Sequence, residues 1–258
     1  MNRNVKIVAV MVMLMLMFAF SGCGSNNGST DTSEDKTDKD ETTVEVDMDK
    51  VTINTQSSIK LEGSKTIYID PFKRSEKTRD ADIIFITHAH YDHFDKKSMK
   101  RAAGKETVIV CPKSMLNDIG ALGISDKVTG MEPGEEQEID GIKVEAVPAY
   151  NIDKSFHPKD NGWLGYVITL DGVRYYAAGD TDALDELADI ECDVALVPIG
   201  GKYTMTAEEA AGLVNKICPK YAVPTHYGSI VGSASDADAF ASRVDTEIKV
   251  VKKVKDTM

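Results

Sequence analysis

Four polar side chains crowd into six residues directly after an apolar stretch of this chain. The segment His88-Ala89-His90-Tyr91-Asp92-His93 follows the run Asp82–Thr87, which fits a short strand buried on both faces. Packing does not explain four polar groups at the end of a buried strand. Two histidines two residues apart on extended or turning backbone can point the same way and bind one ion. The segment therefore predicts a metal site at the end of a strand.

The rest of the histidine complement fits the same site. The chain has 5 histidines, and the two outside the cluster are His157 and His226. An acidic residue, Asp180, lies between them in Gly179-Asp180-Thr181. Imidazole and carboxylate together suit zinc, iron or manganese. The pattern indicates a metalloenzyme in which all the histidines belong to the metal site.

The remaining pattern alternates strand-like and helix-like stretches. Many strands come early, and strands interleaved with helices follow, which predicts two packed sheets covered by helices, an α+β fold. The predicted strands are Val51–Thr55, Ser58–Leu61, Thr66–Asp70, Asp82–Thr87, Val108–Cys111, Lys127–Met131, Glu136–Ile139, Ile142–Ala149, Leu164–Leu170, Val173–Ala178, Val194–Pro198, Tyr221–Pro224 and Glu247–Val251. The predicted helices are Lys96–Ala103, Pro112–Leu122, Ala183–Asp189, Thr206–Ile217 and Ser235–Val244.

The first 22 residues read as an export signal. Arg3 and Lys6 precede an apolar run, Ile7–Phe20, that is short for a membrane span and ends in small residues. The segment Phe20-Ser21-Gly22-Cys23 resembles the lipobox of bacterial lipoproteins, with Phe20 where Leu is usual. The resemblance implies cleavage before Cys23, lipid on that cysteine, and a membrane-anchored protein outside the cytoplasm. A plain secretory signal or an uncleaved anchor is the alternative.

Residues 23–50 are expected to form a disordered tether, and residues 51–258 the folded domain. The stretch Gly24–Lys50 is polar, with almost no large apolar residue before Val44, and it cannot bury enough surface to offset the entropy of ordering. The alternative is that part of Thr43–Asp49 forms an edge strand.

The net charge and the cysteines add little about the function. The net charge of −12 argues against nucleic acid as a partner, so a small-molecule substrate is expected, with membrane contact only through the N-terminal lipid. Cys111, Cys192 and Cys218 match no zinc spacing and are expected to be small buried residues, or one disulfide with a spare thiol. The oligomeric state is not readable from the sequence.

The histidine motif, Gly179-Asp180-Thr181 and Pro224-Thr225-His226 each follow a predicted strand, and Asp70-Pro71 ends an earlier one. In this order they resemble the metallo-β-lactamase fold superfamily, from about Val51 onward, and its compact lactonase-like branch in particular. The resemblance implies a four-layer αββα sandwich with two divalent metal ions, zinc first and manganese or iron as alternatives. It implies the following ligands: His88 and His90 for the first ion, Asp92, His93 and His226 for the second, and Asp180 as the bridge.

The third ligand of the first ion departs from the family pattern. Many members carry a histidine after the strand that here ends in Pro148-Ala149-Tyr150-Asn151. Asn151 occupies that place, and His157, six residues on, is the available histidine. We expect His157 to fill the role, and the alternative is that Asn151 or water does.

The resemblance implies hydrolysis of an ester, lactone or phosphodiester bond by a hydroxide that bridges the two ions, with Asp92 also orienting it. Candidate substrate contacts are Lys202, Trp163 and Tyr227. One alternative is a surface metal- or ligand-binding lipoprotein without turnover. A di-iron oxygen or nitric-oxide reductase of the same fold fits less well, because such proteins usually carry Glu at the position of His90 and a flavin domain.

Overall fold

A computed structural model describes residues 44–253 of the chain. The predicted signal peptide, the lipidation site Cys23 and the tether up to residue 43 lie outside these residues. Among the residues described, no helix combines the length and apolar character that a membrane crossing requires.

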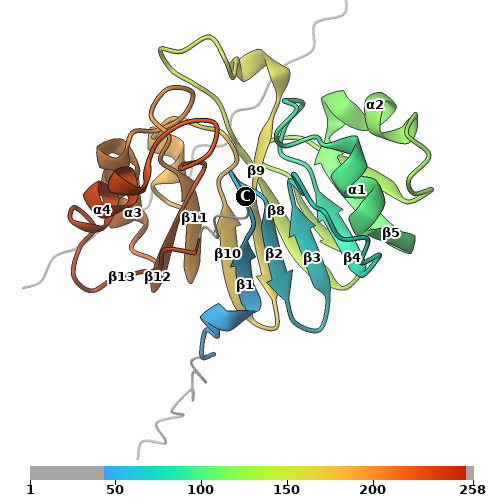
Figure 1. Cartoon of the computed structure of the whole chain (residues 1–258), viewed down its shortest axis with the longest axis horizontal. Coiled ribbons are helices and arrows are strands. Elements are labelled where there is room, and N and C mark those ends of the chain that lie inside the picture. Colours follow the sequence, from blue (N-terminus) through green and yellow to red (C-terminus); the bar gives the residue numbers. More distant parts are fainter. Residues whose placement is uncertain (1–43, 254–258) are drawn as a thin grey trace, which may run out of the picture. The chain divides into compact units, whose positions relative to one another are not determined.

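Two mixed sheets form the centre of the domain (Figure 1). The first has six strands in chain order: β1 (Val51–Ile53), β2 (Ile59–Glu62), β3 (Thr66–Ile69), β4 (Ala81–Phe85), β5 (Ala103–Pro112) and β6 (Val128–Met131). The second has seven strands, in the order β13-β12-β11-β10-β9-β8-β7: β7 (Glu136–Ile139), β8 (Ile142–Pro148), β9 (Leu164–Leu170), β10 (Val173–Ala177), β11 (Val194–Pro198), β12 (Tyr221–Thr225) and β13 (Lys249–Val250).

Each sheet is antiparallel in one half and parallel in the other. Strands β1 to β3 form a meander and β3 to β6 run parallel. Strands β7 to β10 form the second meander and β10 to β13 run parallel. Parallel neighbours need crossover connections, and these contain α1 (Lys96–Ala102), α2 (Leu116–Gly120), α3 (Ala207–Ile217) and α4 (Ala234–Ala241).

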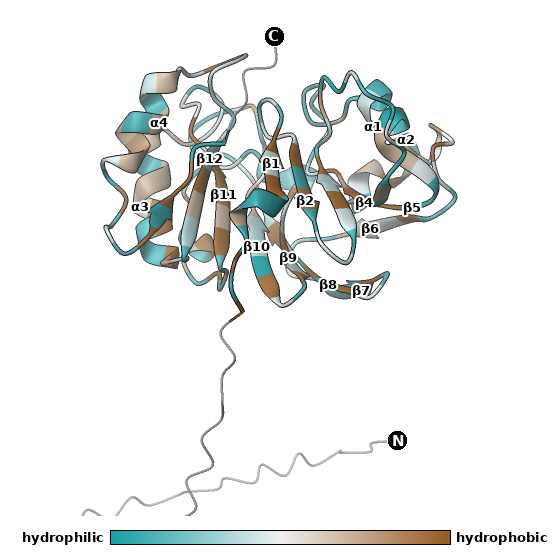
Figure 2. Cartoon of the chain, turned by 60° about the horizontal axis from the view of Figure 1, so that its bottom comes forward, coloured by the Kyte–Doolittle hydropathy of each residue, from teal (hydrophilic) through white to brown (hydrophobic). Residues whose placement is uncertain are grey.

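Three separate hydrophobic clusters show that the domain has four layers. The first joins the inner faces of both sheets, with Ile83 and Phe85 of β4 opposite Tyr166 of β9. The second lies between the second sheet and helices α3 and α4, and the third between the first sheet and helices α1 and α2. Because side chains alternate along a strand, Ile83 faces the other sheet while Ile84 faces the helices. Figure 2 shows the hydrophobic residues concentrated along the strands. The predicted αββα sandwich is confirmed.

Local sequence explains most of the element boundaries. The Thr206 side chain accepts from the Glu209 amide and Glu209 caps Thr206 in return, which is the predicted capping box of α3. The predicted hairpin at Asp171-Gly172 joins β9 to β10, and both residues have positive φ angles of 51° and 80°, as a type I′ turn requires.

Two predicted helices differ from the sequence-based expectation. The predicted helix Ala183–Asp189 is only a 3-10 turn, Asp185–Leu187, because Leu184 stays extended and offers no side-chain cap. The predicted helix Pro112–Leu122 begins later, since β5 continues to Pro112; a 3-10 turn, Lys113–Met115, then leads into α2.

The folded part also begins before the expected boundary at Val51. Val46 is buried in the core between the sheets, and Met48 packs against it. Met48–Lys50 forms a 3-10 helix capped by the Asp47 side chain. The last seven residues assigned to the tether, from Val44 to Lys50, thus lie within the part of the chain that the structure describes.

Candidate metal centre

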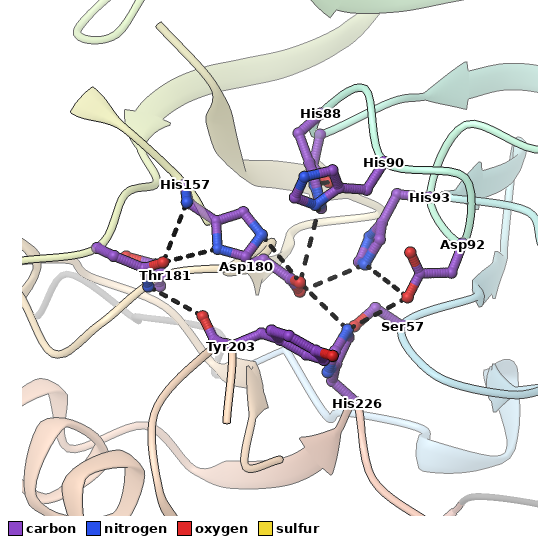
Figure 3. Close-up of polar contacts among 12 residues, drawn as sticks. Ser57, His88, His90, Asp92, His93, His157, Asp180, Thr181, Tyr203 and His226 are labelled. Carbon is purple, nitrogen blue, oxygen red and sulfur yellow. Dashed lines mark hydrogen bonds and ion pairs between the residues drawn. The ribbon is translucent and has the colours of Figure 1, made fainter. Parts of the chain in front are cut away.

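The candidate site lies where strands of both sheets end. His88 and His93 follow β4, Asp180 follows β10, and His226 follows β12. His157 comes from the loop after β8. The seven predicted ligands, which come from both sheets, meet in one place (Figure 3). Loops held by a rigid scaffold commonly carry functional groups in this way.

Asp180 lies at the centre of the group. Its Oδ2 is 3.1 Å from Nε2 of His226 and 3.3 Å from Nε2 of His157. Its Oδ1 is 3.4 Å from Nε2 of His93, and Nε2 of His88 lies 3.9 Å from Oδ2. The carboxylate therefore faces four imidazole nitrogens that belong to three different segments, as a bridging ligand would.

The other six residues divide into two triads on either side of Asp180. One triad is His88, His90 and His157, and the other is Asp92, His93 and His226. Within each triad the potential ligand atoms lie within 4.8 Å of one another. The geometry thus offers two adjacent positions for a cation, one with three nitrogen donors and one with two nitrogen donors and a carboxylate, with Asp180 between them.

Asp70 supports the site from behind. Its Oδ1 accepts from the Thr87 amide at 2.8 Å, and its Oδ2 accepts from the Thr87 hydroxyl at 2.6 Å and lies 2.7 Å from Nδ1 of His93. Asp70, His88 and His93 also bring potential ligand atoms close together. Because both Asp70 oxygens are already engaged, we assign Asp70 the orientation of His93 and not the binding of an ion.

Thr87 determines which nitrogen of His88 is available. The single hydroxyl proton of Thr87 is donated to Asp70, so the hydroxyl oxygen accepts from Nδ1–H of His88 at 2.9 Å. Nε2 of His88 then carries a lone pair, forms a hydrogen bond with Nδ1 of His90 at 3.1 Å and faces Asp180. This hydrogen-bond pattern selects the tautomer that a metal ligand needs.

The structure brings His157, and not Asn151, to the inner face of the site. The Asn151 amide donates to the His157 carbonyl at 2.8 Å and the His157 amide donates to Oδ1 of Asn151 at 3.1 Å. These two bonds close a short loop, so that His157 lies beside Asn151 despite the six-residue separation. Oδ1 of Asn151 also lies 2.9 Å from Nδ1 of His157, which leaves Nε2 of His157 facing Asp180.

Gln56 is a neighbour of the site that the sequence did not indicate. It is fully buried in the turn between β1 and β2, with a φ of 52°. Its Nε2 lies 3.5 Å from Oδ2 of Asp92 and 3.4 Å from Nε2 of His226. Its carbonyl accepts from the His226 amide at 3.0 Å. No strand-end or spacing pattern marks a glutamine in a turn, so this contact depends on the tertiary structure.

The electrostatics of the site are strongly coupled. Burial would lower the pKa of His93, but the carboxylates of Asp180 and Asp70 raise it well above its usual value. Burial opposes a similar increase at His226, where Asp180 and Asp92 raise the pKa to about 9. Burial would raise the pKa of Asp180, but His226 and His93 hold it well below the usual range. Protons on the two histidines thus balance the carboxylates, and a bound cation would replace those protons.

Buried polar atoms that lack a hydrogen bond indicate that the site fits a metal ion. Within residues 44–253 such atoms include Nε2 of His93, Nε2 of His157 and Oδ1 of Asp180, all of which point into the group. Leaving a buried polar atom without a hydrogen bond typically costs about 1–3 kcal/mol. Three such atoms converging from histidine and aspartate fit the donor set that zinc, manganese or iron binds.

A cavity of about 250 Å³ opens over the site. Its lining consists of His90, Tyr91, Asp92, Phe156, His157, Asp180, Tyr203, His226 and Ile230. The three substrate contacts expected from the sequence, Lys202, Trp163 and Tyr227, are absent from this lining. Phe156, Tyr203 and Ile230, which the sequence did not single out, are present in it.

The positions of the expected contacts have separate physical reasons. The Trp163 ring packs 5.0 Å from the rings of His88 and His90 and braces the first triad. Tyr227 is only 6 % exposed and belongs to the core beneath α3 and α4. Lys202 is exposed, with its Nζ over the Tyr203 ring at 5.1 Å.

A family model and known relatives place the chain in the same group of proteins. A family model described as a beta-lactamase superfamily domain matches residues 40–226. A UPF0173 metal-dependent hydrolase of Pyrococcus horikoshii is 34 % identical over 216 residues, which cover 78 % of this chain and 95 % of that protein. A UPF0173 metal-dependent hydrolase of Thermococcus kodakarensis is 35 % identical over 215 residues, with the same shares covered.

Solved structures agree with the sequence relatives. A crystal structure of a candidate metal-dependent hydrolase from Parabacteroides distasonis is 30 % identical and has a TM-score of 0.67, covering 80 % of this chain and 93 % of that one. A metallo hydrolase from Ignicoccus hospitalis is 25 % identical with a TM-score of 0.65, covering 80 % and 95 %. The chain therefore belongs to the metallo-β-lactamase superfamily, and within it to the UPF0173 family of metal-dependent hydrolases.

Proposed function

We propose that this protein hydrolyses an ester, lactone or phosphodiester bond at a dinuclear metal site. The observation that carries the proposal is the position of Asp180 between two complete triads, one of three histidines and one of two histidines and an aspartate. His88, His90 and His157 would hold the first ion, and Asp92, His93 and His226 the second. Zinc suits this donor set best, with manganese and iron as alternatives.

Two bound ions would supply Lewis acidity toward the scissile group and a water acidified to a bridging hydroxide near neutral pH. The protein's own residues hold the metal ligands in position. Thr87 and Asp70 hold His88 and His93 in position, and Asn151 holds His157. Because these supports are buried, the imidazoles keep their orientation whether or not substrate is present.

Asp92 has a second role beside metal binding. It lines the cavity, and its Oδ2 lies 3.5 Å from Nε2 of His226. Burial would raise its pKa, but His226 and His93 keep it below the usual value, so the side chain is a carboxylate at neutral pH. An ionised acceptor at the cavity surface can orient the attacking water and take up its proton.

The decisive experiment combines metal content with turnover. A soluble variant that lacks residues 1–42 is loaded with zinc, manganese or iron, freed of excess metal and assayed on ester, lactone and phosphodiester substrates. We expect about two ions per chain and turnover that a chelator abolishes and the metal restores. Asp180→Asn should lower both metal content and turnover by at least about 100-fold, while Asp118→Asn, an exposed acid on α2, should change neither.

The outcome also separates the proposal from metal capture without catalysis. A protein that binds two ions tightly but hydrolyses none of the three substrate classes would be a metal- or ligand-binding protein. Full turnover by a chelated protein, or by Asp180→Asn, would contradict the dinuclear mechanism.

A further inference from the structure

Exposed hydrophobic side chains gather at the mouth of the metal cavity. Within residues 44–253 only five large hydrophobic residues are exposed: Val44, Tyr91, Ile152, Phe156 and Ile230. Three of them, Tyr91, Phe156 and Ile230, line this cavity. A soluble domain scatters such residues singly, and their concentration at one opening marks a surface that binds an apolar group.

Aromatic contacts hold the cavity walls in place. The Phe156 ring packs edge-on against the Tyr203 ring, with 4.6 Å between centroids. Tyr91 lies 6.1 Å from Phe72 in a similar edge-on arrangement. The amide of Ile230 donates to Oε1 of Gln56 at 3.4 Å. The apolar residues are therefore held by defined contacts and form a wall for a ligand.

The charged side chains of the cavity lining also restrict the ligand. No lysine or arginine is among the residues that line the cavity. Lys154, on the neighbouring loop, pairs with Oδ1 of Asp182 at 2.5 Å, and Lys202 packs over Tyr203 outside the lining. Phosphate and carboxylate groups of ligands are usually bound by arginine or lysine. An anionic substituent placed against Phe156 or Ile230 would lose its hydration without gaining a partner.

Size restricts the ligand as well. A cavity of about 250 Å³ lies below the roughly 300–1,000 Å³ of pockets that bury drug-sized molecules. Its floor is polar, with His90, Asp92, His157, Asp180 and His226, and its walls are apolar. One end of a small substrate thus meets the metal ligands while the other meets Phe156, Tyr203 and Ile230.

We propose that the substrate is a small, uncharged carboxylic ester or lactone whose apolar substituent rests on Phe156, Tyr203, Ile230 and Tyr91. This inference rests on the proposed function and selects the carbonyl substrates over the phosphodiester. Water oxygen bonds to the carbonyl carbon, the bond from that carbon to the alkoxy oxygen breaks, and the alkoxy oxygen takes one water proton. An ester gives an alcohol and a carboxylic acid, a lactone gives a single hydroxy acid, and in both cases the acid proton passes to solvent.

The test compares neutral and charged substrates of equal length. Zinc-loaded protein lacking residues 1–42 is assayed on 4-nitrophenyl butyrate, on the hemisuccinate ester and on bis(4-nitrophenyl) phosphate. We expect kcat/KM for the butyrate to exceed that for the hemisuccinate by at least about 100-fold, since the carboxylate must be desolvated. Equal or better use of the hemisuccinate or the phosphodiester would overturn this inference while leaving the proposed hydrolase intact.

Variants of the wall give a second readout. Phe156→Ala should raise KM for the butyrate about tenfold. Ile230→Lys should shift preference toward the hemisuccinate. Ile152→Ser is the matched control, because Ile152 is exposed on the same loop as Phe156 but does not line the cavity. Unchanged butyrate KM in Phe156→Ala together with unchanged preference in Ile230→Lys would overturn the inference.

Binding without turnover distinguishes this inference from the proposed function. Hydroxamic acids with a butyl or a carboxypropyl tail are titrated into the zinc-loaded protein by calorimetry. Tighter binding of the butyl compound, weakened by Phe156→Ala, would support the apolar wall even if no ester were hydrolysed and the proposed function failed. Equal affinity for the two compounds would overturn the inference whatever the assays showed.

Discussion

Asn151 holds His157 through both its backbone and its side chain. Its amide donates to the His157 carbonyl at 2.8 Å, and its Oδ1 lies 2.9 Å from Nδ1 of the imidazole. The Asn151 side-chain amide in turn donates to Oδ1 of Asp182 and to the Tyr203 carbonyl, both at 3.0 Å. The residue at the expected ligand position thus acts as a support for a histidine that the loop returns to the site.

Removing that support should loosen the first triad. Asn151→Ala deletes the acceptor of Nδ1–H of His157, so the ring can rotate and Nε2 is no longer directed at Asp180. Loss of such a partner commonly costs about 10–100-fold in metal affinity or activity. We expect this loss in a chelator competition assay, with one of the two ions affected more than the other. Asn117→Ala, at an exposed position on α2, is the control and should match the parent protein.

Substitution of Asp70 should weaken metal binding by the second triad in a similar way. In Asp70→Asn one oxygen becomes an amide nitrogen, which donates and cannot accept, so the side chain no longer accepts from the Thr87 amide, the Thr87 hydroxyl and His93 together as the carboxylate does. We expect metal affinity to fall about 10–100-fold while circular dichroism shows an intact fold. Unchanged affinity would show that the Asp70 carboxylate is not needed to orient His93.

The strand-end pattern of the sequence predicted which side chains gather at the candidate site, but it did not predict the residues that support them. His88, His93, Asp180 and His226 each follow an apolar run, because parallel strands of both sheets end at one edge. Gln56 lies beside them only through tertiary contacts, and Asp182, two residues after Asp180, supports Asn151 through a contact between segments far apart in the chain. Spacing along the chain carries no signal for such contacts.

The sequence likewise did not predict the residues of the cavity walls. Phe156 and Ile230 lie in irregular loops, where no periodicity tells an exposed residue from a buried one. Tyr227 was expected at the site because it follows His226, but the positive φ of His226, 56°, marks a change of backbone direction there, and Tyr227 packs in the core. Neighbours in sequence thus lie on opposite sides of the turn.

Replacing either of two glycines by alanine should change the free energy of unfolding, but in opposite directions. In β9 a Cβ at Gly165 would lie 2.7 Å from the Ala178 carbonyl oxygen and 3.0 Å from that of Ala177, both backbone atoms. Gly165→Ala should therefore cost about 1–3 kcal/mol of unfolding free energy. At Gly212 in α3 a Cβ would meet nothing within 4 Å, so Gly212→Ala should stabilise by about 1 kcal/mol.

Thermal unfolding measures both changes on the variant lacking residues 1–42. A change of 1 kcal/mol corresponds to roughly 2–4 °C in Tm for a domain of this size. An increase in Tm for Gly165→Ala would mean that β9 and β10 can separate more easily than the structure indicates.

The three described cysteines are free and should differ in reactivity with pH. Burial raises the pKa of the Cys111 and Cys192 thiols to about 12 each, whereas Cys218 is exposed. The thiolate is the reactive form, so at pH 8 only roughly one in ten thousand of the two buried thiols is ionised, and this fraction rises tenfold per pH unit up to the pKa.

A thiol reagent added to folded protein lacking residues 1–42 should therefore label one cysteine rapidly at pH 8. Cys218→Ser should abolish the rapid phase, and denaturant should expose the other two thiols. Fewer than three thiols after denaturation under non-reducing conditions would reveal a disulfide in the isolated protein.

The lipidation site can be tested by cell fractionation. Cys23 carries the only side chain in the lipobox-like segment Phe20-Ser21-Gly22-Cys23 that could accept a thioether-linked lipid. If cleavage and lipidation occur there, Cys23→Ser should move the protein from the membrane fraction to the soluble exported fraction and leave hydrolysis unchanged. Cys218→Ser should remain in the membrane fraction. Retention of Cys23→Ser in the membrane would instead indicate an uncleaved anchor, and a soluble parent protein would indicate a plain secretory signal.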